Sequence, residues 1–283
     1  MDDLWISENG LKILETLERF QFMTVDQLTR AGKFKNKAVV RRQANEYSVR
    51  RAPLIHCKDF GALPGMGRLH KIYAMSEHGA ETLAEYRQCD ASELSFLTGK
   101  IQFSIDYTHR INFVDVHISI REWAEKAGAD IGFFTGYFET VGANRTGKDS
   151  LKSTKKNRVD LPSNRYIIPD GIFSFFLGEK NRLCALEIHR GKDTKIILEQ
   201  LDKHIEALYT SAIQSKYGHK TANFVLSVYE HAGTMEAVKR RIGENPKFSA
   251  VARAFHFSTL DAIKADICTA WTLADGSPLS LFV

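Results

Sequence analysis

A chain of 283 residues, of which 43% are hydrophobic and 26% charged, is long enough to fold as one large domain or two small ones. The N-terminus lacks the pattern of a signal peptide and no run of about 18 apolar residues occurs, so we expect a cytoplasmic protein without a membrane partner. Four widely spaced cysteines form no CxxC pair, which argues against a disulfide framework or a zinc knuckle.

Residues 1–90 begin with the local signals of three consecutive helices. Ser7 is a typical N-cap for a first amphipathic helix. Thr24 and Gln27 have the spacing of a capping box and predict the start of a second helix. A third helix is expected over residues 36–48.

Two strands and a closing helix are predicted next. The strands are PLIHC (53–57) and HKIYAM (70–75), and a turn rich in Gly and Pro (61–67) separates them. Ser76 then predicts the start of a helix over residues 77–86. Three helices, a two-stranded wing and a closing helix are the pattern of a winged helix-turn-helix, so we expect a DNA-binding domain here.

Basic residues gather around the third helix, which is the element that such a domain places against DNA. From Arg30 to Arg51, eight cations accompany a single acid, Glu46. We expect these cations to contact phosphates, although a solvated helix face is the alternative. Asn36, Gln43 and Asn45 are the amides that could reach base edges. The candidate DNA-binding residues are Lys35, Lys37, Arg41, Arg42, Gln43, Asn45, Arg50 and Arg51, with Arg68, His70 and Lys71 at the wing.

The chain changes character after residue 90. Residues 91–108 are interpreted as a connector to a second domain over 109–283, which opens with a helix over 109–126. The segment 141–166 has no hydrophobic period and is rich in Lys and Arg, so we interpret it as a long mobile loop. Its Lys155 and Lys156 could close over a nucleic-acid backbone; a plain flexible insertion is the alternative.

The segment 167–194 carries the strongest chemical signal. It predicts two apolar antiparallel strands that bring Asp170 and Glu187 to one end of a hairpin. His189 is two residues after Glu187 and therefore shares its face of the strand. A pair of carboxylates suits Mg²⁺ or Mn²⁺ and the hydrolysis of phosphodiesters. The alternative is a turn residue at 170 and an exposed ion pair between Glu187 and Arg190.

The remaining elements complete an α/β domain. We expect a helix over residues 194–215, a buried strand over 224–230 and a helix that contains Arg240 and Arg241. Residues 254–258 are predicted as the last strand of the sheet. The order of elements indicates a mixed sheet with helices on its faces.

Three short motifs carry a resemblance to a known family. They are residues 73–79 at the end of the predicted wing, Ile168–Gly171 at a strand start and Leu186–Gly191 at a strand end before a helix. The second domain resembles the PD-(D/E)xK restriction-endonuclease-like fold. The whole chain is similar to the replication-relaxation family of plasmid and phage proteins, which join an N-terminal winged helix to such a core.

The resemblance implies a role in plasmid or phage DNA processing, together with other replication or mobilisation proteins. Asp170 and Glu187 would be the carboxylates that bind Mg²⁺ or Mn²⁺. The position of the family's lysine holds His189 in this sequence, and Lys192 or Lys203 could supply a cation instead. Gln200 would support the site from the following helix. The candidate catalytic residues are Asp170, Glu187, His189, Lys192 and Gln200.

Two functions remain open from the sequence. The first is a relaxase-like or endonuclease-like enzyme that the winged helix directs to its DNA site. The second is a non-catalytic accessory factor or transcriptional regulator, in which the nuclease-like domain serves as a scaffold or as the surface of a homodimer. Candidate tyrosine nucleophiles, by position alone, are Tyr107, Tyr137, Tyr166 and Tyr209.

Overall fold

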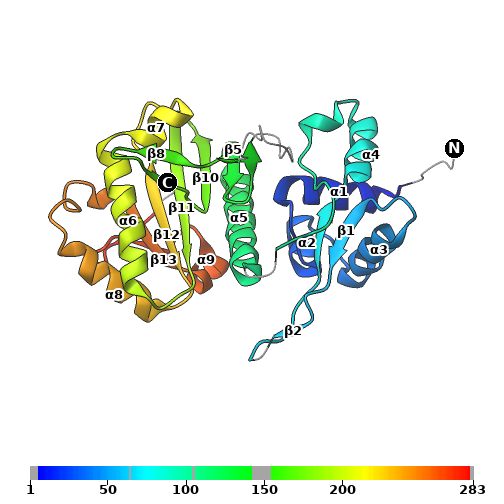
Figure 1. Cartoon of the computed structure of the whole chain (residues 1–283), viewed down its shortest axis with the longest axis horizontal. Coiled ribbons are helices and arrows are strands. Elements are labelled where there is room, and N and C mark those ends of the chain that lie inside the picture. Colours follow the sequence, from blue (N-terminus) through cyan, green and yellow to red (C-terminus); the bar gives the residue numbers. More distant parts are fainter. Residues whose placement is uncertain (1–5, 64, 104–105, 142–153, 281–283) are drawn as a thin grey trace, which may run out of the picture. The chain divides into compact units, whose positions relative to one another are not determined.

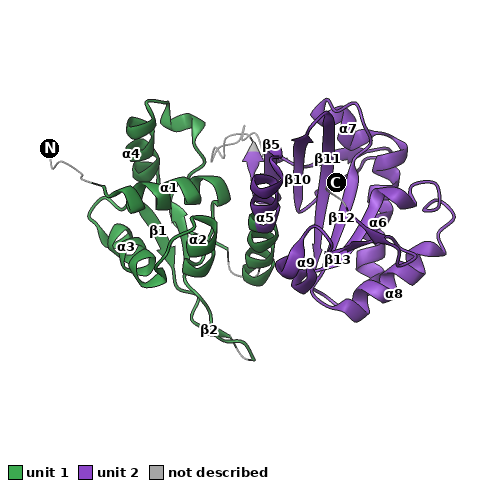
Figure 2. Ribbon diagram, turned by 180° about the vertical axis from the view of Figure 1, so that it is seen from behind, with its two compact units in different colours: residues 1–118 green, residues 119–283 purple. Residues whose placement is uncertain are grey.

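The computed structural model describes residues 6–63, 65–103, 106–141 and 154–280 and has a mixed α/β fold. The chain forms two compact units, residues 1–118 and 119–283 (Figure 2). The division falls inside helix α5 (Tyr107–Ala127), so the predicted boundary at 108/109 differs from the one that the packing defines. Within the described ranges, no helix has the length and apolar character needed to cross a membrane.

Unit 1 contains the predicted helices, and their caps are those that the sequence indicated. Ser7 Oγ accepts a hydrogen bond from the Gly10 amide, and Thr24 and Gln27 form the complete capping box. Asn36 caps the third helix. The helices are α1 (Glu8–Phe20), α2 (Val25–Ala31), α3 (Lys37–Val49) and α4 (Glu77–Arg87), with a short 3-10 turn, η1 (Ala91–Glu93).

The strands of unit 1 form two antiparallel pairs (Figure 1). Strand β1 (Ile55–Lys58) pairs with β4 (Ile72–Met75), and between them β2 (Ala62–Leu63) pairs with β3 (Gly67–Arg68). Gly79 lets α4 pass close to this pair, because a Cβ atom there would lie 2.2 Å from the Leu54 carbonyl oxygen. The β2–β3 hairpin largely coincides with the predicted turn at residues 61–67.

Unit 2 is built on a seven-stranded mixed sheet in the order β15-β14-β13-β12-β11-β10-β5. Strands β11, β12 and β13 are parallel neighbours, and the other pairs are antiparallel. The strands are β5 (Asp130–Gly136), β10 (Gly171–Leu177), β11 (Lys180–His189), β12 (Phe224–Tyr229), β13 (Phe255–Thr259), β14 (Trp271–Thr272) and β15 (Pro278–Leu279). The helices after α5 are α6 (Thr194–Tyr209), α7 (Ala212–Tyr217), α8 (Ala232–Gly243) and α9 (Leu260–Asp266), with η2 (Ala252–Ala254).

The two faces of the sheet are covered by different helices. Phe173 and Phe175 point to one face, where Phe175 meets Trp123 of α5 with ring centroids 5.1 Å apart. The opposite face packs against α6 and α8, and its apolar contacts include Val225 and Phe257. Glu187 contacts side chains of α6, so the predicted carboxylate lies between the sheet and this helix.

Three predictions about unit 2 need correction. The helix predicted over 194–215 ends at Tyr209, because Ser211 has a left-handed backbone with φ 54° before α7 begins. Residues 254–258 do not form the last strand, since β14 and β15 extend the sheet. The range 141–166 is not one irregular loop: apart from 142–153, which lie outside the described residues, it contains short strands. They are β6 (Thr140–Val141) paired with β7 (Thr154–Lys155), and β8 (Val159–Leu161) paired with β9 (Arg165–Ile167).

Candidate nucleic-acid interface and carboxylate cluster

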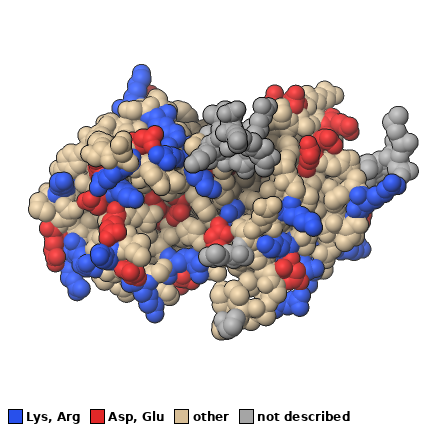
Figure 3. All heavy atoms as spheres, in the orientation of Figure 1, with Lys and Arg blue, Asp and Glu red and all other residues tan. Residues whose placement is uncertain are grey.

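A basic hollow of about 420 Å³ lies in unit 1 between α3 and residues 68–73, which belong to the predicted wing. We define the basic hollow by its charged and polar lining residues, Lys37, Arg41, Asn45, Arg68, His70, Lys71 and Tyr73, with Val25 and Leu69 as apolar neighbours. It joins the predicted cations of the third helix to those of the wing. Figure 3 shows basic and acidic side chains interspersed on the visible face of both units.

The cations of the basic hollow differ in their partners. Lys37 pairs with Asp26 of α2, and Arg68 donates to Asp59 at 2.7 Å. Arg41 and Lys71 are exposed, and neither forms an ion pair with a described residue. Two cations are therefore held in place by carboxylates, and two are available for an external anion.

The other predicted DNA contacts of unit 1 lie outside this lining. Lys35, Arg42 and Arg51 are exposed. Arg50 donates to Glu46 at 2.8 Å and stacks over the Tyr47 ring. These cations can add to the positive field around α3, but they do not line the hollow.

Lys155 and Lys156, predicted as part of a basic flap, belong to unit 2. Lys155 is in β7, and the Lys156 ammonium lies 3.2 Å from the Glu139 carboxylate. The described part of the flap is thus held by hairpin pairing and an ion pair.

The carboxylate cluster lies where β10 begins and β11 ends. Asp170 immediately precedes β10, and its Oδ2 accepts the Ile188 amide at 2.7 Å. Glu187 is fully buried and follows Leu186, which pairs with Gly171, the residue after Asp170. Its Oε1 is 2.6 Å from His204 Nε2, and its Oε2 accepts Gln200 Nε2 at 2.5 Å. The prediction that Asp170, Glu187 and Gln200 lie close together agrees with these contacts.

His189 lies on the same face of β11, as predicted, but its partners are on β12. Its Nε2 is 2.9 Å from Ser227 Oγ, and Ser227 Oγ donates to the Tyr229 hydroxyl at 3.0 Å. The His189 and Tyr229 rings have centroids 4.7 Å apart. His189 is therefore a buried member of a hydrogen-bonded chain of side chains.

Of the two lysines predicted to supply a cation, only Lys203 acts on Glu187. Lys192 is exposed in the turn after β11, and the cation that lowers the Glu187 pKa is Lys203 on α6. Arg190 lies 3.7 Å from Glu230, so the alternative ion pair between Arg190 and Glu187 is not formed. The chain thus offers the carboxylate cluster one nearby ammonium group, from α6.

Burial controls the protonation of this cluster. Desolvation raises the pKa of Glu187 well above its ordinary value, and the neighbouring Asp170 charge raises it further. Desolvation, with the nearby His189, lowers the pKa of His204 to about 3. Both shifts favour the neutral forms of the two side chains, the protonated carboxyl of Glu187 and the uncharged imidazole of His204.

The cluster is closed to solvent at Glu187. The Glu187 carboxylate is fully buried and each of its oxygens has one hydrogen-bond partner, so a divalent ion would have to enter a buried, hydrogen-bonded cluster. Among the described residues, no group of three or more His, Cys, Asp or Glu side chains could hold a metal. The sequence predicted the pair of acids and the supporting Gln200 but not the contact with His204.

Sequence reasoning missed His204, Ser227 and Tyr229. His204 follows Gln200 by four residues on α6, so both project from one helix face toward Glu187. That spacing was the available signal. Ser227 and Tyr229 are two residues apart on the buried strand β12, so their side chains share one face of the sheet. The apolar residues of this strand gave no sign of a polar site there.

The candidate tyrosine nucleophiles differ in their contacts. The backbone amide of Tyr137 donates to the Asp170 carbonyl at 2.8 Å, so this residue is beside the carboxylate cluster. The hydroxyl of Tyr107 donates to the His70 carbonyl, and that of Tyr209 donates to the Lys247 carbonyl. Tyr166 stacks against Arg158, and Tyr137 lies in the turn after β5. The tyrosine that the structure places near Glu187 is Tyr229.

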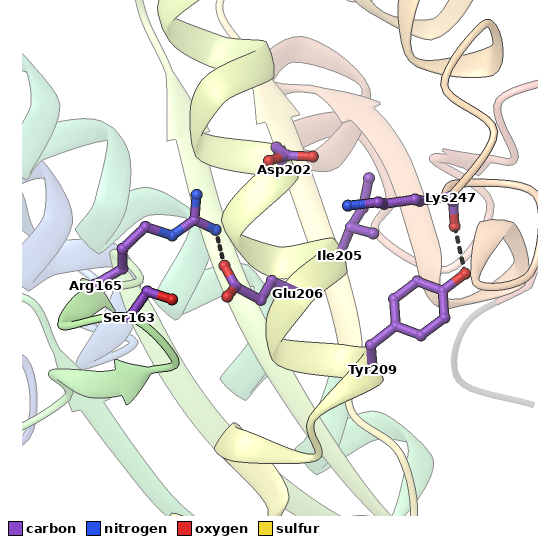
Figure 4. A pocket seen from close by; sticks show the side chains of 7 residues that line it. All are labelled: Ser163, Arg165, Asp202, Ile205, Glu206, Tyr209 and Lys247. Carbon is purple, nitrogen blue, oxygen red and sulfur yellow. Dashed lines mark hydrogen bonds and ion pairs between the residues drawn. The ribbon is translucent and has the colours of Figure 1, made fainter.

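A second cavity, of about 560 Å³, lies on the outer side of α6. Figure 4 shows Arg165 directed at Glu206 and the Tyr209 hydroxyl bonded to Lys247. Asp202 adds a second acid to the lining. Its charges are mixed and partly paired within the protein, which gives it no preference for an anion or a cation.

Comparison with protein-family models, curated proteins and solved structures found no match to this chain.

Proposed function

We propose that this protein binds double-stranded DNA through the basic hollow. The observation that supports the proposal is the convergence of cations from two separate elements, Lys37 and Arg41 of α3 with Arg68 and Lys71 of the wing, on one open surface. Clustered Lys and Arg side chains release counterions when they contact phosphates. A solvated helix face would not require the wing to contribute cations to the same hollow.

The order of elements in unit 1 supports a winged-helix reading of this surface. Its elements follow one another as in that fold: three helices come first, then the β1–β4 pair with its β2–β3 hairpin, and then α4. In such a domain α3 enters the major groove while the wing contacts the adjacent backbone. We therefore assign base contacts to α3 and phosphate contacts to both elements.

Removing the two available cations tests this proposal. Arg41→Ala combined with Lys71→Ala should weaken binding to a duplex and lower the slope of log K against log salt by about 2, since each phosphate contact contributes about 0.9. The matched control is Lys220→Ala with Arg240→Ala, which removes two exposed cations from unit 2. An unchanged slope in the first variant would show that the hollow is not the DNA-binding surface.

For the whole protein we favour a replication or mobilisation accessory factor or a regulator that acts on plasmid or phage DNA. The complete burial of Glu187 favours this non-catalytic function, because it leaves the nuclease-like unit without a solvent-accessible carboxylate pair. Unit 2 would then serve as a scaffold.

Metal-dependent nicking of DNA is the second candidate. The observation in its favour is that Asp170 and Glu187 meet on neighbouring strands, with Gln200 reaching Glu187 from the next helix. This is the arrangement that the resemblance to PD-(D/E)xK nucleases implies. Mg²⁺ or Mn²⁺ would be the ion.

A nicking assay separates the two candidates. Supercoiled plasmid is incubated with Mn²⁺ and either the wild type, Asp170→Asn or Glu187→Gln, with Glu236→Gln as an exposed carboxylate control. Nicking by the wild type and control that is lost in both site variants would establish the catalytic function. Nicking that survives both substitutions would place the activity elsewhere, and its absence throughout supports the binding function.

A further inference from the structure

Of the three side-chain amides considered for base contacts, only Asn45 lines the basic hollow. Asn36 caps α3, where its Oδ1 accepts the amides of Ala38 and Val39 at 2.9 and 3.3 Å. Gln43 donates its Nε2 to Ser7 Oγ at 2.9 Å. Asn45 is half-buried and borders the hollow between Arg41 and the wing. Direct base recognition by an amide of this helix therefore depends on Asn45.

A buried hydroxyl fixes the orientation of the Asn45 amide. The Tyr73 hydroxyl donates to Asn45 Oδ1 at 2.9 Å. Tyr73 is 1% exposed and belongs to β4, which pairs with β1, so the position of its ring is set by the core of unit 1. Because the carbonyl of the Asn45 amide is engaged by Tyr73, its NH₂ group is the part that a ligand in the hollow meets.

We propose that Asn45 is a specificity-determining residue that selects guanine in the major groove. Guanine presents two acceptors there, N7 and O6, whereas cytosine presents an N4 donor that an amide NH₂ would oppose. Adenine is normally read by both ends of an asparagine amide. In this protein the oxygen that adenine would need already accepts Tyr73. The inference rests on the proposed DNA-binding function and adds to it the base that is read.

The charged side chains of the hollow should contribute to the affinity for any DNA, and the uncharged Asn45 to the preference for one sequence. Arg41 and Lys71 line the hollow as charged side chains, so they attract a phosphate backbone of any sequence. Asn45 carries no charge, so its contribution appears as a difference between sequences. Substitutions at these two kinds of position should therefore have different signatures in binding measurements.

Selection from a pool of duplexes with a randomised central segment tests the proposal. The full-length wild type should enrich a site that contains guanine. Changing that guanine pair should weaken binding by about 5- to 150-fold, the range of one well-placed base contact. Asn45→Ala should bind the selected and the changed duplex almost equally while keeping the salt slope of the wild type.

Tyr73→Phe provides the second variant. It keeps the buried ring and removes the hydroxyl, so the amide of Asn45 can rotate and present its oxygen. We expect this variant to bind duplexes with adenine at the selected position as well as those with guanine, with unchanged affinity for random duplexes. Tyr217→Phe is the matched control, because it removes a tyrosine hydroxyl in unit 2 and should leave the guanine preference intact.

Three results would overturn the inference. The first is salt-dependent binding by the wild type without enrichment of any base. The second is retention of the guanine preference by Asn45→Ala, and the third is a preference for cytosine that depends on Asn45. Each leaves DNA binding through the hollow intact. Failure of the wild type to bind any duplex would instead reject both the proposed function and the inference.

Discussion

A carboxyl group that is buried beside another acid keeps its proton at a pH where an exposed one would lose it, and Glu187 is in this position. Because its pKa is raised in the folded state, the unfolded chain releases this proton first as the pH increases. The free energy of unfolding should therefore fall as the pH rises above about 4.5, until the folded pKa is passed.

Glu187→Gln isolates this effect, since glutamine can keep the contacts to Gln200 and His204 without titrating. We expect the variant to gain stability relative to the wild type with increasing pH, by roughly 1.4 kcal/mol for each unit of the folded-state shift. Urea unfolding of both proteins at a series of pH values measures the difference. A difference that stays constant from mildly acidic to alkaline pH would contradict the raised pKa.

His204 acts in the opposite direction, so the two groups can be distinguished. Its pKa is lowered to about 3 in the folded state, and its contribution to stability is present above about 6.5 and lost as the pH falls toward 3. His204 therefore contributes to loss of stability in acid, together with His256, whose pKa burial lowers to about 4, whereas Glu187 contributes to loss of stability as the pH rises above about 4.5.

Residue patterns predicted part of the carboxylate cluster. Asp170 and Glu187 were found together because strand alternation and hairpin pairing are geometric rules that the sequence displays. The hydrogen bond between Glu187 and His204 was not predicted, since a histidine on an amphipathic helix without a ligand motif has no local signature. The same limit applied to Asn45, whose direction depends on a tyrosine 28 positions away.

At the scale of elements, helix caps were the most reliable signals. Ser7, Thr24 and Ser76 each accept the predicted amide hydrogen bond at the start of a helix. The two-residue strands β14 and β15 were missed because periodicity cannot be recognised over so short a length. The break after Tyr209 was missed because Ser211 adopts a left-handed backbone without a Gly or Pro to indicate it.

Gln27 links α2 to α5, and substituting it tests how much this link contributes to the stability of unit 1. It completes the capping box of α2, and its Nε2 also donates to the Ile111 carbonyl at 2.9 Å and to Asp115 Oδ1 at 2.8 Å. Gln27→Ala should lower the free energy of unfolding by about 1–3 kcal/mol, because it removes a cap contact and leaves buried acceptors with fewer donors. Chemical denaturation gives this value.

Lys35→Ala, an exposed substitution before α3, is the control and should change the stability by less than about 0.5 kcal/mol. Equal effects of the two substitutions would show that Gln27 does not link α2 to α5 in solution.

For the whole molecule, the chain divides later than the sequence suggested. The predicted connector is tied to unit 1: Lys58 Nζ donates to the Phe103 carbonyl at 2.7 Å, and Tyr107 contacts His70. The first half of α5 receives the hydrogen bonds of Gln27. Composition indicated a boundary near residue 90, but these contacts connect residues far apart in the sequence, which local patterns do not reveal.

A fragment comparison follows from this division. Residues 1–118 should unfold cooperatively and at a higher temperature than residues 1–90, which lack Phe103 and the start of α5. A loss of even 1 kcal/mol shifts the midpoint of a domain of this size by about 4–8 °C. Thermal unfolding followed by circular dichroism measures both midpoints. Equal midpoints would mean that residues 91–118 contribute nothing to unit 1.

The hydrogen bond between Tyr73 and Asn45 has a consequence for titration with alkali. Desolvation raises the pKa of Tyr73 above that of an exposed phenol, so its hydroxyl keeps its proton when surface tyrosines have already ionised. A neutral hydroxyl continues to donate to the amide, and the orientation of Asn45 is preserved over the same range. Base discrimination by this residue should therefore be insensitive to pH for as long as the fold itself persists.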